Sequence, residues 1–177
     1  NSAGYGVIGD FEHSELSDVT GMIELNCTAL AAVTHICLPY MARGSRMIQM
    51  ASAAAFLPQP NFAVYAATKA FVLSLSKALN YELEERGIYV TAVCPGPVST
   101  EFFTLAEKRE PMAAYKKLTM VKPEHVVKAA LKASSDKREV SVYSLSIKAT
   151  SVLAKLLPHK WILSIMQKNN SKKDVIE

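Results

Sequence analysis

The sequence predicts an α/β fold built on a doubly wound, Rossmann-like parallel sheet, and three observations support this. Long segments with apolar residues at helical spacing alternate with short apolar runs that suit buried strands. No tight hairpin turn joins one short run to the next, so consecutive strands must be connected through helices. Half of the 177 residues are apolar and 20% are charged, which is the composition of one globular domain with a continuous core.

The first elements are a loop, a long helix and a strand. Residues 1–6, NSAGYG, tolerate tight turns and predict a loop. Ser17 or Asp18 is placed to cap a helix that runs to about Arg43, along which apolar residues recur at helical spacing. The short apolar run RMIQMAS, residues 46–52, predicts a buried strand, and the two prolines after it indicate a loop.

The second half repeats this order. A long helix is expected from about Tyr65 to Glu85, with Gly87 ending it. The run IYVTAVCPGPV, residues 88–98, predicts another buried strand that CPGP interrupts. After an irregular or weakly helical stretch, a proline opens the helical pattern PEHVVKAALKAS, and REVSVYSL follows as the last strand.

The predicted sheet is small for its class, because doubly wound folds bind nucleotides with two halves. Gly4, Gly6 and Gly9 precede no strand-to-helix turn, so no glycine-rich phosphate-binding turn is visible. We therefore expect the N-terminal half of the fold to be missing from this chain. Residues 1–143 are expected to form the C-terminal portion of a Rossmann-like catalytic domain, and residues 144–177 a basic amphipathic helical tail.

Charge and cysteine usage narrow the class of protein. The net charge of +4 is mild and gathers after Lys148, which argues against a nucleic-acid-binding face. Cys27, Cys37 and Cys94 form no CxxC pair, and this favours reduced thiols in a cytoplasmic protein. The histidines show no metal-ligand spacing, so we assign no metal. No unbroken apolar run reaches the roughly 18 residues that span a bilayer, and no leader opens the chain.

Tyr65 and Lys69 are four residues apart in the second helix, so both side chains lie on one face. An ammonium beside a phenol favours the phenolate and lowers a pKa that starts near about 10, which suits proton exchange with a substrate oxygen. With seven tyrosines and frequent lysines, a chain of this length has roughly even odds of containing one Tyr-x-x-x-Lys by chance. The pair therefore gains weight only from its surroundings.

Polar and small residues follow the two predicted central strands, at the sheet edge where ligands bind. Ser52 ends the first strand, where a hydroxyl can donate to the carbonyl that a phenol protonates. In CPGPV, residues 94–98, Gly96 allows close approach to a flat ring, although a plain turn explains the motif equally well. Asn26 lies mid-helix among apolar neighbours, either as a satisfied core amide or as a group that organises a water beside Lys69.

NSAG, Asn26 in a long helix, Ser52 after a strand, YAATK and PGPVST occur in an order and spacing that resemble the short-chain dehydrogenase/reductase family. NSAG is similar to the family's NNAG, with Ser2 in place of the second asparagine. The resemblance covers about residues 1–143. It implies an oxidoreductase that transfers a hydride between NADP or NAD, with NADP slightly preferred, and a hydrophobic ketone or secondary alcohol.

By that resemblance four residues are catalytic. Tyr65 is the general acid or base, Lys69 lowers its pKa and binds the nicotinamide ribose, and Ser52 orients the carbonyl. Asn26 would hold a water between Lys69 and solvent. The chain alone, without a dinucleotide-binding half, is expected to be inactive. The residues expected to bind the cofactor are Asn1, Ala3, Gly4, Tyr65, Lys69, Pro95, Gly96, Val98 and Thr100.

Apolar residues near the site bear on the substrate. Those between Glu101 and Val121, and those after Ser52, are expected either to cover a hydrophobic substrate or to pack beneath a loop. These residues are Phe102, Phe103, Leu105, Met112, Tyr115, Met120, Ala54, Phe56, Leu57 and Phe62.

The tail offers a second kind of contact. Leu145, Val152, Leu156 and their neighbours form an apolar face, Trp161 follows a proline, and lysines line the segment. This suits contact with protein, either over the active site or in a partner subunit, or peripheral contact with an anionic membrane. By the same resemblance, the two long helices are expected to form the contacts of a homodimer or homotetramer. A catalytically silent nucleotide-binding relative and a lipid-surface interaction protein remain the alternatives to the enzyme.

Overall fold

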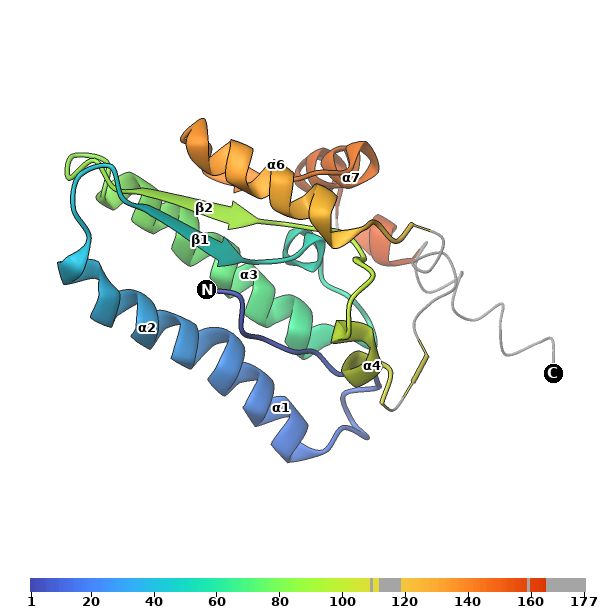
Figure 1. Cartoon of the computed structure of the whole chain (residues 1–177). Helices are drawn as coiled ribbons and strands as arrows, with labels where there is room; N and C mark the ends of the chain where they lie inside the picture. The colour runs from blue at the N-terminus through green and yellow to red at the C-terminus, as the bar shows by residue number, and fades with distance from the viewer. Residues whose placement is uncertain (109, 112–118, 159, 165–177) are drawn as a thin grey trace.

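The computed structural model describes residues 1–108, 110–111, 119–158 and 160–164. In this part of the chain, three parallel strands form a sheet in the order β1 (Arg46–Met50), β2 (Tyr89–Val93), β3 (Val140–Ser141). Helices cover both faces of the sheet (Figure 1). The expected α/β architecture with a parallel sheet and helical connections is confirmed.

The strand register brings the carboxyl ends of β1 and β2 to the same edge. Arg46 pairs with Tyr89 and Met50 with Val93. Asn1 lies beside the edge of β1 that does not pair with β2. Its amino group donates to the Ile48 carbonyl at 3.0 Å, and its carbonyl accepts from the Met50 N–H at 3.0 Å. The loop that follows Asn1 is thereby fixed along the ligand-facing end of the sheet.

A helical segment of 25 residues, Leu16–Tyr40, lies against α3 on one side of the sheet. By length and composition alone, this helix could cross a membrane. We did not predict this from the sequence, because we looked for an unbroken apolar run. Its fully buried Asn26 and its buried Thr34 bond to other elements, and these contacts make it a packed helix of the domain. Its parts are α1 (Leu16–Ile23), η1 (Glu24–Ala29), α2 (Leu30–Cys37) and η2 (Leu38–Tyr40).

Alternate residues of β2 face opposite helical layers, as expected for a buried strand. Ala92 packs in a cluster with Val72 of α3 (Ala63–Glu82), whereas Val93 packs with Val126 and Ala130 of α6 (Pro123–Ser135). The helix α6 begins at the expected proline. The strands are shorter than predicted: β2 ends before the CPGP turn, where prolines without an N–H cannot continue a ladder.

Three short or peripheral elements surround the carboxyl ends of the strands. They are η3 (Ala53–Phe56), α4 (Phe102–Ala106) and α7 (Leu145–Leu156). The helix α7 packs beside η3, at the end of the molecule toward which β1 and β2 point (Figure 1). The first part of the predicted tail is therefore a helix next to the functional edge of the sheet.

Candidate active site

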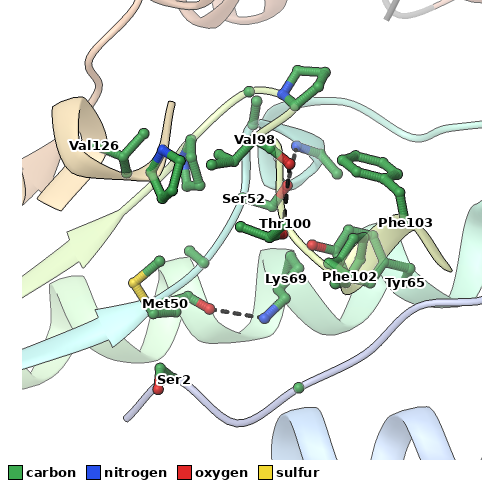
Figure 2. A pocket seen from close by; sticks show the side chains of 18 of the residues that line it. Ser2, Met50, Ser52, Tyr65, Lys69, Val98, Thr100, Phe102, Phe103 and Val126 are labelled. Carbon is green, nitrogen blue, oxygen red and sulfur yellow. Dashed lines mark hydrogen bonds between the residues drawn. The ribbon is translucent and has the colours of Figure 1, made fainter. Parts of the chain in front are cut away.

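A cavity of about 380 Å³ lies at the carboxyl ends of β1 and β2. Ser52, Tyr65 and Lys69 all contribute to its wall, although they come from a loop and from two successive turns of α3 (Figure 2). Most of the remaining wall is apolar, with phenylalanines from two segments, the residue before α3 and the start of α4. The structure thus brings together the three polar groups that the sequence placed in one site.

Tyr65 is held among aromatic rings. Tyr65 is 7% exposed, and its ring stacks on that of Phe62 with centroids 4.3 Å apart, while the centroid of the tilted Phe102 ring lies 5.3 Å away. Burial raises the pKa of the Tyr65 phenol to about 12, and a hydrogen bond with Ser52 acts in the opposite direction. The expectation of a lowered phenol pKa is therefore wrong for this structure, because desolvation outweighs the stabilisation of the phenolate.

Lys69 lies one helical turn beyond Tyr65, with its ammonium 5.6 Å from the centroid of the phenol ring. The side chain is 5% exposed, and Nζ donates to the Met50 carbonyl at 2.8 Å. Burial lowers the pKa of Lys69 to about 8, against a smaller opposing effect of the Cys27 and Cys94 thiols. The end of β1 therefore fixes the ammonium in position.

Ser52 follows β1 and begins η3. Its hydroxyl oxygen accepts a hydrogen bond from the Ala54 N–H at 3.1 Å, which caps the short helix and restrains the side chain. Because an accepting hydroxyl still has its own hydrogen to give, Ser52 can also donate toward the cavity. This hydrogen bond therefore holds the Ser52 hydroxyl in a fixed position at the cavity wall.

Asn26 lies at the centre of the π-helical segment η1 and is fully buried. Its amide nitrogen donates to the Tyr5 carbonyl at 2.8 Å and to the Thr68 hydroxyl at 3.0 Å, and its oxygen accepts from the Tyr5 N–H at 3.0 Å. A π-helical turn inside an α-helix often marks a functional position. Asn26 does not contribute to the cavity wall, so in this structure it is a satisfied amide that anchors the loop after Asn1.

Gly4 separates Asn26 from Lys69. A Cβ atom at residue 4 would lie 2.8 Å from the Asn26 oxygen and 3.2 Å from Lys69 Nζ, so only glycine allows the backbone to pass between the two side chains. The amide is therefore close to the ammonium although it does not face the cavity.

The cofactor-binding expectations separate into two groups. Gly4, Tyr65, Lys69, Pro95, Gly96, Val98 and Thr100 contribute to the cavity wall, whereas Asn1 and Ala3 do not. The Asn1 side chain turns toward α2, where it donates to the Thr34 hydroxyl at 3.2 Å. Gly96 leaves the wall flat, because its missing side chain would point at Ile147 rather than into the cavity. The residues present fit a flat nicotinamide ring beside Lys69.

The apolar expectations divide in a similar way. Ala54, Phe62, Phe102 and Phe103 line the cavity, but Phe56 and Leu57 do not, and Leu105 is 58% exposed. Met120 packs against the core cluster of Val7 and Ile8. Met112 and Tyr115 lie outside the described residues.

Several wall residues were missed by the sequence reasoning. Pro123, Val126 and Val127 come from the start of α6, where the helical pattern marks an inner face but not which part of that face reaches a cavity. The Met50 carbonyl and the Thr68 hydroxyl hold Lys69 and Asn26. Thr68 could have been noticed, because it lies one turn after Tyr65 in YAATK.

A cluster of potential metal ligands lies elsewhere. Asp10, Glu12 and His13 bring ligand atoms within 4.8 Å of one another on an exposed loop. The sequence did not suggest this group, because only the spacing of histidines was considered. None of the three residues contributes to the cavity.

Comparison with known proteins agrees with this geometry. A family model described as short chain dehydrogenase matches residues 1–111. The Homo sapiens protein named very-long-chain 3-oxoacyl-CoA reductase is 29% identical over 152 residues, which cover 85% of this chain and 46% of that protein. The chain spans between about a third and a half of the length of the first curated relatives that it matches.

Two solved structures extend the likeness. A short-chain dehydrogenase from Sphingobium yanoikuyae in complex with NADPH is 27% identical, with a TM-score of 0.67 and coverage of 99% of this chain and 64% of that one. A 3-ketoacyl-(acyl-carrier-protein) reductase from Brucella melitensis complexed with NADH is 25% identical, with a TM-score of 0.67 and coverage of 79% and 62%.

Proposed function

The chain belongs to the short-chain dehydrogenase family. On that premise we propose that it is part of an NAD(P)-dependent oxidoreductase that acts on a hydrophobic ketone or secondary alcohol. One observation carries the proposal: Ser52, Tyr65 and Lys69 share the wall of one largely apolar cavity at the carboxyl ends of the strands. That is the edge at which doubly wound sheets hold ligands. A protein without catalysis would not need these three groups in one place.

The protein's part in the reaction is to manage protons and geometry. The cofactor, when bound, supplies or accepts the hydride. In reduction, Tyr65 gives its phenolic proton to the substrate oxygen, and its raised pKa keeps that proton in place at neutral pH. Ser52 donates a hydrogen bond to the same oxygen, and Lys69 favours the phenolate that remains after the transfer.

Residues near Lys69 would hold the nicotinamide half of the cofactor. Gly96 and Val98 belong to a loop fixed by a bridge between Val98 and Val121, and Thr100 follows on the cavity wall. Gly4 brings the backbone close to Lys69 on the other side. The cofactor is NADP or NAD, and the similar structures whose complexes are named contain either NADPH or NADH.

The wall composition supports an apolar substrate. Phe62, Phe102 and Phe103 line the cavity together with valines from α6, and Lys69 is the only cation among the described residues of the wall. An anionic group of the substrate placed inside the cavity would therefore have no cationic partner except Lys69, so we expect the part of the substrate that enters the cavity to be apolar. The names of the human and Brucella proteins point to 3-oxoacyl chains, and we propose a ketone of this lipid-like kind.

We further propose that the natural protein contains an N-terminal half outside this chain, which would complete the nucleotide-binding sheet, and that it forms a homodimer or homotetramer. The three-stranded sheet and the partial coverage of the relatives support the first point. A natural protein whose intact mass equals the 19.3 kDa of this chain would contradict it.

The natural protein should be assayed with 3-oxoacyl-CoA substrates of several chain lengths. The measurement is the fall in absorbance as NADPH or NADH is oxidised. We expect Tyr65→Phe to lower turnover by about 10²- to 10⁴-fold while NADPH binding persists, because only proton transfer is removed. Tyr81→Phe is the matched control, since Tyr81 lies on the same helix and is 81% exposed. Turnover of Tyr65→Phe equal to that of Tyr81→Phe would refute the mechanism.

A further inference from the structure

The helix α7 exposes an apolar stripe on the side that faces away from the protein. Its inner side carries Ile147, which lies against Gly96. Leu145, Val152 and Leu156 recur at helical spacing on the opposite side, and these side chains are 80%, 55% and 74% exposed. Single exposed apolar residues are ordinary, but an aligned stripe of this kind is typical of a contact surface.

The stripe continues beyond the helix. Leu157 is 39% exposed, and Trp161, at the start of the helical turn after Pro158, is 65% exposed. Trp161 is the only tryptophan of the chain. Tryptophan is enriched where protein meets the boundary between the headgroups and the hydrocarbon of a membrane, because its ring is apolar and its N–H needs a polar partner.

Positive charge accompanies this stripe. Residues 144–177 contain six lysines and two acidic residues, a net charge of +4, whereas residues 1–143 contain fourteen basic and fourteen acidic residues and are neutral. The tail therefore accounts for the whole net charge of +4. Between residues 144 and 164 there is no acidic residue, and the Lys148 and Lys160 side chains lie exposed beside the stripe.

We propose that α7 and residues 160–164, the docking face, lie on the surface of an anionic lipid bilayer. The apolar stripe would enter the headgroup boundary, and the lysines would contact anionic headgroups. A second copy of the chain is a poorer occupant, because a two-fold contact sets the same surface against itself, and between residues 144 and 164 that surface has no acidic residue to pair with the lysines of the other copy. The lipid surface is the partner whose charge complements the tail.

The docking face also lies close to the cavity. Gly96 contributes to the cavity wall, and its other side meets Ile147 on the inner side of α7. A bilayer bound to the outer side of α7 would therefore lie one helix away from the cavity. The proposal does not depend on the oxidoreductase function, since binding to lipid requires neither substrate nor cofactor.

The emission of Trp161 gives a direct test with the full chain. On vesicles of phosphatidylcholine with phosphatidylglycerol we expect a blue shift and cosedimentation, because Trp161 leaves water and its emission cannot be confused with that of another tryptophan. Phosphatidylcholine alone, or high salt with the mixed vesicles, should weaken both signals. Unchanged emission on mixed vesicles, or equal binding to both lipids, would overturn the proposal. So would a blue shift without vesicles that grows with protein concentration, since a second copy would then cover the stripe.

Two substitutions should separate the apolar and electrostatic contributions while keeping Trp161 as the probe. Leu156→Ser should weaken vesicle binding by at least about tenfold, and Lys148→Gln by about fivefold. The control Tyr40→Ser changes a residue that is 87% exposed at the end of η2, and its binding should match that of the unsubstituted chain. Equal weakening by Tyr40→Ser and Leu156→Ser would overturn the assignment of the surface.

Discussion

The cavity wall and the docking face use the same kind of residue in opposite ways. Lys69 is 5% exposed and donates to one backbone carbonyl, and burial lowers its pKa to about 8. Lys148 and Lys160 lie exposed on a segment without an acidic residue. The electrostatic effect of a buried lysine is short-ranged and depends on the group that it bonds. An exposed lysine acts mainly by adding to the net charge of its segment.

The same contrast holds for the groups around these lysines. Near the cavity, polar atoms are buried and paired, as the three hydrogen bonds of the Asn26 amide show. On the docking face, apolar side chains such as Leu156 are exposed instead. Substitutions near the cavity should therefore change the stability of the fold, and substitutions on the docking face should change only what the protein binds.

The largest effect is expected for Asn26→Ala. The substitution removes the Asn26 partners of the partly buried Tyr5 N–H and C=O and opens a small cavity at the fully buried position 26, so we expect a loss of about 4 kcal/mol in the free energy of unfolding. Asn80→Ala is the matched control, because Asn80 accepts a single hydrogen bond, from the Val90 N–H at 2.9 Å. It should lose about 1 kcal/mol.

Urea denaturation measures both values. Leu156→Ser adds the comparison with the docking face, and its loss should stay below about 0.5 kcal/mol because the side chain is already in water. If Asn26→Ala and Asn80→Ala lose the same amount, the anchoring of the Tyr5 loop by Asn26 does not contribute to stability, and the contrast between the two regions fails at this residue.

The second effect concerns the dependence of stability on pH. Lys69 has an ordinary pKa of 10.5 when unfolded and about 8 when folded. Between these pH values the unfolded chain binds a proton that the folded chain does not, so stability should rise with pH by about 3 kcal/mol. Lys69→Met should lack this rise, whereas Lys148→Met should keep it.

Denaturation from about pH 7 to about pH 10 tests the difference between the two variants. Tyr65 and Cys94 act in the opposite direction at higher pH, because the folded phenol and thiol keep their protons up to about pH 12 whereas the unfolded groups lose theirs near 10 and 9. Comparison with Lys148→Met removes these contributions, since Tyr65 and Cys94 are present in both variants. The same pH slope in both would show that Lys69 is not desolvated as the structure indicates.

The sequence was sufficient to predict that Ser52, Tyr65 and Lys69 converge. Their order after a buried strand and on one helix face determines where they lie once the sheet is parallel, because the strand ends meet at one edge. The helix that begins at Pro123 was predictable for a similar local reason, since proline suits a first helical position. These conclusions need only spacing and local preference.

Other features depend on residues that meet only in the folded chain. The direction of the Tyr65 pKa shift was predicted wrongly because Phe62 and Phe102, which bury the phenol, come from separate segments. The buried Asn26 amide finds its backbone partners in the loop at Tyr5, 21 residues away. Spacing along the chain gives no measure of such burial, and a charged neighbour alone does not determine a pKa.

The smallest effect, and the one that compares both regions directly, is expected from two glycines. A Cβ at Gly6 would lie 2.6 Å from Cδ2 of Tyr65 and 2.8 Å from Cζ of Phe62, and neither ring can withdraw easily because they stack on each other. Gly6→Ala should therefore lose about 2 kcal/mol in the free energy of unfolding and lower turnover in the natural protein by displacing the phenol. A Cβ at Gly96 would meet Ile147 at 3.2 Å, and α7 can move outward because its far side faces solvent. Gly96→Ala should lose less than about 0.5 kcal/mol, and equal losses in urea denaturation would mean that α7 is packed as rigidly as the wall around Tyr65.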